Sequence, residues 1–267
     1  VKLFDRSPTG MRLTPAGISV YKDAKFLLSF SKESIKRAKE IEKNEGNLVR
    51  VALSPLTPTK FLGQVWPIAS KQYPDLRIQL VPFENEKNIV WNMLSHLGSD
   101  GQVDIVVATY DEDFLERRNC TALKLRDLQL SICMSSTHKL AQKEKISIED
   151  LVEATRRRGG GLLLRSDDWM RGYDNVKEIF THDERIEKEF YDFLTMDILN
   201  RCGNSNYFLL ATESWIFSHP LIKAVPLDIN ATLPFGAIHS KKPSEPVKKF
   251  LRIVDFVNLE YKNFQLW

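Results

Sequence analysis

The sequence predicts an α/β protein of two half-domains, preceded by a short hairpin and one long helix. Two observations carry this prediction: strand-like and helix-like segments alternate from residue 47 onward, and a long stretch near the amino end lacks both Pro and Gly. The composition is that of an ordinary globular protein, with 43% hydrophobic residues among 267 and 12 each of Gly and Pro. It excludes collagen-like, disordered and low-complexity chains.

Residues 1–17 alternate apolar and polar side chains around a turn at Pro8-Thr9-Gly10, which predicts a β-hairpin. A two-stranded hairpin is marginal in water by itself, so another surface must cover it. We therefore expect the chain to begin in the middle of a domain.

Residues 18–44 predict one helix about 40 Å long, because they lack Pro and Gly and Gly46 follows as a stop signal. Its apolar residues step by three and four along one narrow stripe, which is typical of a helix that packs against a partner helix. Phe26, Leu27 and Phe30 lie outside the stripe and need a second covering surface. The stripe consists of Ile18, Tyr21, Ala24, Leu28, Ser31, Ile35, Ala38 and Ile41.

The positive charge is confined to this front end. The whole chain has a net charge of +3, but residues 1–50 hold eleven Lys/Arg and six Asp/Glu, a net +5 that leaves −2 for the remainder. This asymmetry favours contact between the front end and a polyanion. A solvated, lysine-rich helix is the alternative explanation.

The next part of the chain predicts a parallel sheet with helices on both faces, because strands and helices alternate. The predicted strands are 48–53, 77–83 and 103–109, and the predicted helices are 58–73 and 87–97. A second set of predicted strands and helices follows. Two half-domains fit this pattern better than one continuous sheet. Its predicted strands are 128–134, 162–165, 187–191, 208–212, 223–227 and 235–240, and its helices are 136–142, 175–182, 195–202 (ended by Gly203) and 246–259.

No motif for catalysis or metal binding is present. The three cysteines, Cys120, Cys133 and Cys202, form no C-x-x-C pair, and the five histidines form neither H-x-x-x-H nor H-E-x-x-H. Gly159-Gly160-Gly161 lacks the Lys-Ser/Thr of a phosphate loop, and no G-x-S-x-G turn exists. The front end lacks a signal-peptide pattern and no apolar run is long enough to span a membrane, so a cytoplasmic protein is favoured.

A ligand cleft is predicted at the carboxyl ends of the strands. Thr57 and Pro58 suit the cap and first position of a helix, so backbone N–H groups near Thr59 would be available to an anion. Thr109 and Tyr110 end a neighbouring strand. The alternative is that Thr57 merely caps its helix.

Several segments resemble the LysR-type transcriptional regulators. Leu3-Phe-Asp-Arg6 with Leu13-Thr-Pro-Ala-Gly17 resembles the end of that family's winged helix-turn-helix domain. His138-Lys-Leu-Ala141, followed by Ile148-Glu-Asp-Leu151, is similar to the family's H-P-L-A and L-x-x-L stretches, with Lys139 in place of Pro. Cys202-Gly203 before residues 208–210 resembles its A-G-x-G segment. The resemblance spans nearly the whole chain and is strongest in its first seventeen residues.

The resemblance implies a two-lobed effector domain like periplasmic solute-binding proteins of type 2, joined to a linker helix and a remnant of the winged helix-turn-helix. The implied parts are a wing (1–17), a linker and dimerisation helix (18–46), lobe I (47–125 and 234–267) and lobe II (126–233). The family's recognition helix would precede Val1 and is missing here. A homodimer or homotetramer is implied, with DNA bound through the full-length protein.

The implied function is the sensing of a small-molecule co-inducer between two lobes, without catalysis and without another cofactor. DNA contacts are implied at Lys2, Arg6 and Arg12, and effector contacts at Ser54, Thr57, Thr59, Thr109, Tyr110, Arg165, Ser166 and Asp167. A carboxylate effector suits Arg165, whereas Asp167 and Asp168 suit an amine, and the sequence leaves both open. A free-standing solute-binding protein is the alternative function, and an enzyme on this scaffold would need a catalytic set.

Overall fold

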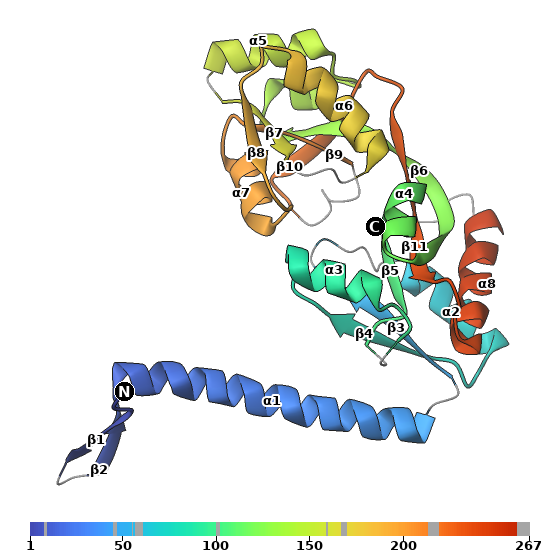
Figure 1. Cartoon of the computed structure of the whole chain (residues 1–267). Helices are drawn as coiled ribbons and strands as arrows, with labels where there is room; N and C mark the ends of the chain where they lie inside the picture. The colour runs from blue at the N-terminus through green and yellow to red at the C-terminus, as the bar shows by residue number, and fades with distance from the viewer. Residues whose placement is uncertain are drawn as a thin grey trace. The chain divides into compact units, whose positions relative to one another are not determined.

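The computed structural model describes residues 1–7, 10–44, 47–54, 56, 61–99, 102–158, 160–166, 170–212 and 219–260. The chain divides into two compact units, residues 1–46 and 47–267, and each is described by itself (Figure 1).

The first unit is a hairpin followed by a long helix. Strand β1 (Phe4–Ser7) pairs antiparallel with β2 (Gly10–Leu13), which confirms the predicted hairpin, although Pro8 and Thr9 lie outside the described residues. Helix α1 runs over Pro15–Asn44.

Helix α1 begins three residues before the predicted start at Ile18. The Thr14 hydroxyl accepts a hydrogen bond from the Gly17 backbone N–H at 3.0 Å, and Pro15 occupies the first helical position. This cap and proline pair is a helix-start signal that the prediction missed, because it assigned residues 1–17 to the hairpin segment. A Cβ on Gly17 would lie 2.0 Å from the Leu3 carbonyl oxygen, so the hairpin approaches the helix where only glycine fits.

The second unit is built on one hydrogen-bonded path of strands, followed here through the described residues: β4-β3-β5-β11-β6-β9-β7-β8, with β10 also paired to β6. In its first half, β3 (Leu48–Leu53) pairs in parallel with β4 (Arg77–Pro82) and β5 (Ile105–Thr109), which confirms the predicted parallel sheet.

Helices cover both faces of this first half, which we call the first lobe. Helices α2 (Leu62–Gln72) and α8 (Glu245–Glu260) share a core with one face, through residues such as Val65 and Phe250. Helices α3 (Lys87–Ser95) and α4 (Glu112–Arg117) share a core with Ala52 and Val106 of the other face.

The second lobe contains β7 (Leu162–Arg165), β8 (Lys188–Tyr191), β9 (Phe208–Thr212) and β10 (Ile222–Pro226). Helices α5 (Ile148–Arg158) and α6 (Arg171–His182) share one core with β7, β9 and β10. Helix α7 (Met196–Asn204) belongs to the core that contains Cys133 and Leu209. The 3₁₀ helix η1 (Lys139–Gln142) follows β6.

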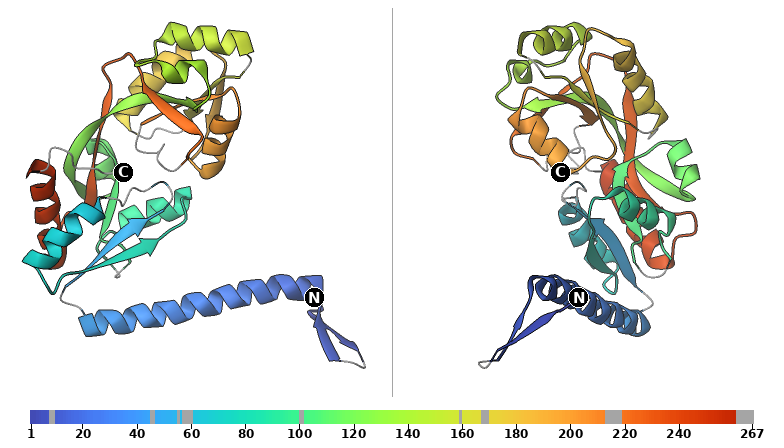
Figure 2. Two further views of the ribbon diagram at one scale, coloured as in Figure 1. Left: turned by 180° about the vertical axis from the view of Figure 1, so that it is seen from behind. Right: turned by 60° about the vertical axis from the view of Figure 1, so that its left-hand side comes forward.

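Two long antiparallel strands join the lobes, β6 (Cys120–Ser135) and β11 (Thr232–Ser240) (Figures 1 and 2). The first part of β6 pairs with β11, and the last part pairs with β9 and β10. The strand path is therefore continuous through β6, whereas the sequence favoured two half-domains over one continuous sheet. The implied lobe boundary at 125/126 falls inside β6. This strand has sixteen extended residues and is roughly 53 Å long, so it reaches from one half into the other.

Element boundaries differ from the predictions at several helices and at two strands, β6 and β11, which begin eight and three residues before the predicted starts at 128 and 235. The strands at 48–53, 162–165 and 208–212 were predicted to the residue. Helix α2 begins at Leu62, with Phe61 at its N-cap and no side-chain cap; the predicted start at Thr57 and Pro58 lies outside the described residues. Gly203 lies within α7 rather than after it, and neither α4 nor α5 was predicted.

Candidate functional site

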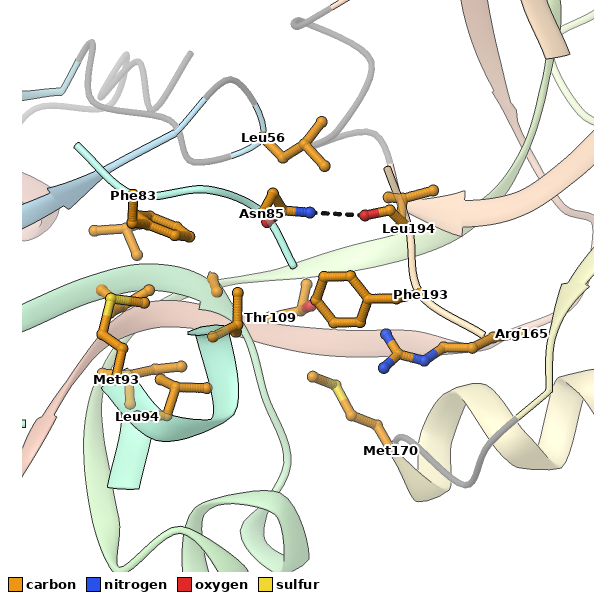
Figure 3. Close-up of a pocket in the computed structure, with 15 residues that line it drawn as sticks. Leu56, Phe83, Asn85, Met93, Leu94, Thr109, Arg165, Met170, Phe193 and Leu194 are labelled. Carbon is orange, nitrogen blue, oxygen red and sulfur yellow. Dashed lines mark hydrogen bonds between the residues drawn. The ribbon is translucent and has the colours of Figure 1, made fainter. Parts of the chain in front are cut away.

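A pocket lies between the two lobes and holds about 630 Å³ of empty space, including solvent-open volume (Figure 3). The first lobe contributes the end of β5, helix α3 and the segment after β4, and the second lobe contributes the end of β7 and the segments before α6 and after β8. The described lining residues are Leu56, Phe83, Asn85, Val90, Met93, Leu94, Val106, Val107, Ala108, Thr109, Arg165, Met170, Phe193, Leu194 and Ile238.

The structure brings two of the predicted effector residues together in this pocket. Thr109 ends β5 and Arg165 ends β7, so the carboxyl ends of parallel strands from both lobes meet at one place, as expected for open α/β sheets. That these residues bind an effector stays a prediction.

The other predicted residues lie elsewhere or outside the described chain. The Ser54 hydroxyl accepts a hydrogen bond from the Leu56 N–H at 3.2 Å and is not in the lining. Tyr110 is buried in the apolar core beside the pocket, where burial raises the pKa of its hydroxyl. Ser166 is exposed and absent from the described lining. Thr57, Thr59 and Asp167 lie outside the described residues.

Arg165 is the charged residue among the described lining residues, and it is only 2% exposed. Its guanidinium carbon lies 5.0 Å from the centre of the Phe193 ring and 5.8 Å from that of Trp91, distances at which a cation is attracted to an aromatic face. Its backbone N–H donates to the Tyr173 hydroxyl at 3.1 Å, which fixes the end of β7. Tyr173 is fully buried, and this burial raises its pKa to about 12.

Contacts between the lobes surround the pocket and were not predicted. Asn85 Nδ2 donates to the Leu194 carbonyl oxygen at 2.7 Å (Figure 3), and Lys87 Nζ lies 2.7 Å from an Asp192 carboxylate oxygen. On the α4 side, the Arg171 backbone N–H donates to Asp111 Oδ2 at 2.6 Å. Asn85 and Leu194 follow the carboxyl ends of β4 and β8, so the rule that selected Thr109 could also have selected them.

The three predicted DNA contacts do not form one basic face. Asp5 lies opposite Arg12 in the hairpin, and Lys2 pairs with Asp5 at 2.8 Å. Because side chains alternate along a strand, Arg6 points to the face opposite Arg12. All three basic residues are exposed.

The described residues contain no group of three His, Cys, Asp or Glu residues placed to hold a metal ion. None of their helices is long and apolar enough to cross a membrane.

The chain is similar to known proteins in sequence and in fold. Residues 42–174 match the family described as the LysR substrate binding domain. A "Probable RuBisCO transcriptional regulator" of Synechocystis sp. (strain ATCC 27184 / PCC 6803 / Kazusa) is 26% identical over 151 residues, 57% of this chain and 42% of that protein. An uncharacterized HTH-type transcriptional regulator of Methanocaldococcus jannaschii is 21% identical over 95% of this chain and 83% of its own length.

Solved structures share the fold at low identity. The crystal structure of CbnR, a LysR family transcriptional regulator, has a TM-score of 0.51 at 17% identity and covers 95% of this chain and 84% of its own. The BenM effector binding domain with its effector benzoate has a TM-score of 0.52 at 18% identity, over 82% of this chain and 95% of its own.

The class that fold and pocket define is a two-lobed α/β domain like the type 2 periplasmic binding proteins. The chain belongs to the LysR family, whose substrate-binding domain it carries. The chain spans less than half of the length of the Synechocystis relative that it matches.

Proposed function

We propose that this chain is the effector-sensing and oligomerisation portion of a LysR-type transcriptional regulator, and that a small metabolite binds in the pocket between its lobes. The observation that carries the proposal is that both lobes line the pocket: Thr109 comes from one lobe and Arg165 from the other. A ligand that contacts both lobes favours the arrangement in which they are close, so its binding shifts the population toward closure.

The described lining suits a sensor better than an enzyme. It contains no histidine, cysteine or carboxylate that could act as nucleophile or general base beside Arg165 and Thr109. Membership of the LysR family also favours a regulator over the alternative of a free-standing solute-binding protein.

The first unit supports an oligomeric, DNA-associated role. Helix α1 carries exposed apolar side chains, including Phe26 at 67% and Leu28 at 64% exposure, and a helix with such a surface favours a partner helix. Arg6 and Arg12 would add phosphate contacts that depend on salt but carry little sequence information. DNA binding by the full-length protein would place it in the cytoplasm.

A pocket-filling variant tests the proposal. Val90 lines the pocket from α3, whereas its neighbour Ile89 is exposed on the same helix. Metabolite pools are titrated into the wild-type chain, Val90→Trp and the matched control Ile89→Trp, with the heat of binding as readout. We expect binding to wild type and to Ile89→Trp, and its loss in Val90→Trp. Equal binding to all three proteins would contradict the assignment of the pocket.

A further inference from the structure

The pocket combines one buried cation with apolar walls, and this combination selects a ligand chemistry. We infer that the effector is a compact carboxylate with an apolar body, an inference that rests on the function proposed above. The carboxylate would meet Arg165 on the second lobe, and the body would lie among the apolar side chains of both lobes (Figure 3).

The guanidinium of Arg165 is suited to a carboxylate. It is 2% exposed and flanked by the Phe193 and Trp91 rings, so a ligand anion would meet it with little competing water. A guanidinium offers five N–H donors in a plane and can hold both oxygens of a carboxylate. Arg165 also interacts within the protein, and five donors leave capacity for a ligand beside that partner.

The remaining walls favour an apolar ligand body. Phe83, Met93, Leu94, Met170 and Phe193 supply hydrocarbon, aromatic and thioether surface, and methionine adapts to irregular shapes. Sugar hydroxyls placed against these side chains would lose hydrogen bonds to water without replacement. Asn85 and Thr109 are the remaining polar side chains of the described lining, enough to orient one ligand group.

A positively charged ligand group finds no complement among the described lining residues. None of them is a carboxylate, and Arg165 repels an ammonium group. The sequence leaves an organic acid and an amino-acid-like effector open, and the described pocket favours the organic acid. Asp167 and Asp168, which favour the amine, lie outside the described residues.

Calorimetric titration of the full chain tests this ligand class with four probes: benzoate, cyclohexanecarboxylate, benzamide and phenylalanine. We expect both acids to bind at least about tenfold more tightly than the other two probes. Benzamide lacks the charged acceptor that strengthens a hydrogen bond to Arg165, and the ammonium group of phenylalanine finds no carboxylate in the described lining. Arg165→Gln should remove that advantage, so that the acids bind it no more tightly than benzamide does. Arg157→Gln, an exposed arginine on α5 outside the lining, should bind as wild type does. Urea midpoints of each variant show whether it folds.

The outcomes separate this inference from the proposed function. An acid that Val90→Trp excludes but Arg165→Gln binds as wild type does, or a preference for the amide or the amino acid, overturns the carboxylate class and leaves the sensor intact. If every molecule that binds wild type binds Val90→Trp equally well, the proposed sensor function itself is wrong. If Arg165→Gln does not fold, the acid-to-amide ratio on the wild-type chain decides alone, and a ratio near one rejects the inference.

Discussion

Tyr173 fixes the end of β7, where Arg165 enters the pocket. Its hydroxyl accepts the Arg165 backbone N–H, and both residues are buried. We expect Tyr173→Phe to destabilise the chain by about 1–3 kcal/mol, because it leaves a buried N–H without its acceptor. Urea unfolding at neutral pH measures this loss, and Tyr207→Phe, a half-buried tyrosine on another segment, serves as control. Equal stability of wild type and Tyr173→Phe would contradict the role given to this hydroxyl.

The same hydroxyl predicts a loss of stability in alkaline solution. Burial raises the folded-state pKa of Tyr173 to about 12, above the ordinary value near 10. Between those values the unfolded chain releases the proton and the folded chain keeps it, so unfolding becomes more favourable as pH rises from 10 to 12. The contribution is on the order of 2–3 kcal/mol. Cys202 acts in the same direction from about pH 9, because its pKa is also raised to about 12.

Urea midpoints measured from pH 8 to 11.5 check this prediction. The wild-type midpoint should fall with pH, and the midpoint of Tyr173→Phe should fall less steeply above pH 10. Parallel curves for the two proteins would show that Tyr173 titrates with an ordinary pKa.

Thr14 is the residue that starts helix α1. Its hydroxyl accepts the Gly17 N–H, so Thr14→Ala should weaken the first turn by about 1 kcal/mol, whereas Thr14→Ser should retain the cap. Hydrogen exchange of the Gly17 and Ile18 amides should become roughly fivefold faster in Thr14→Ala alone. Unchanged exchange in Thr14→Ala would mean that the cap is not formed.

At the scale of elements, the join between the lobes depends on the pairing of β6 with β11. The register shifts between Phe235 and Gly236, and a Cβ on Gly236 would lie 2.1 Å from the Leu123 carbonyl oxygen. We expect Gly236→Ala to destabilise the chain by at least about 2 kcal/mol, because a backbone atom must move.

Gly63 provides the matched control for that substitution. It lies in α2 with open space around the position of a Cβ, so Gly63→Ala should be neutral or stabilising by up to about 1 kcal/mol. Similar urea midpoints for the two alanine variants would show that the close approach at Gly236 is not required.

The sequence predicts strands better than short or unusual elements. Buried strands such as β3 and β7 are mostly apolar, with one arginine each, and their limits were predicted to the residue. Helix α4 has six residues, too few for a helical period to emerge. The first half of β6 was missed because its residues are unevenly buried and show no clean alternation.

Helix α5, in contrast, carries a signal that could have been used. The Ser147 hydroxyl accepts the Asp150 N–H, and the Asp150 carboxylate accepts the Ser147 N–H. This Ser-x-x-Asp pair is a capping box in the sequence, and Leu151 and Thr155 follow at helical spacing.

At the scale of the whole molecule, the pocket depends on contacts that no local pattern contains. The strand-end rule selected Thr109, and the family resemblance added Arg165. Phe193 and Met170 lie on connecting segments whose place in the pocket depends on how the second lobe packs. The basic residues of the hairpin could likewise be selected from the sequence. Their division between the two faces of the hairpin could not, because it depends on the register of the strands.

Closure of the lobes should respond to the ion pair between Lys87 and Asp192. This pair joins the lobes, and Lys87 is not among the described lining residues. We expect Lys87→Ala to weaken ligand binding by up to about fivefold, because a partly exposed ion pair contributes at most about 1 kcal/mol to closure. Lys248→Ala, which breaks a pair within α8, should bind as wild type does in calorimetry. Equal loss in both variants would argue against a closure contact.

The distance between the lobes in solution tests the account most directly. Spin labels on Asn88→Cys in α3 and Asp197→Cys in α7 report it, because both positions are exposed and all three native cysteines are buried. A saturating pocket ligand should shorten and narrow the distance distribution measured by pulsed electron resonance, and Val90→Trp should abolish the change. An identical distribution with and without a ligand that calorimetry shows to be bound would contradict a sensor that works by closing its lobes.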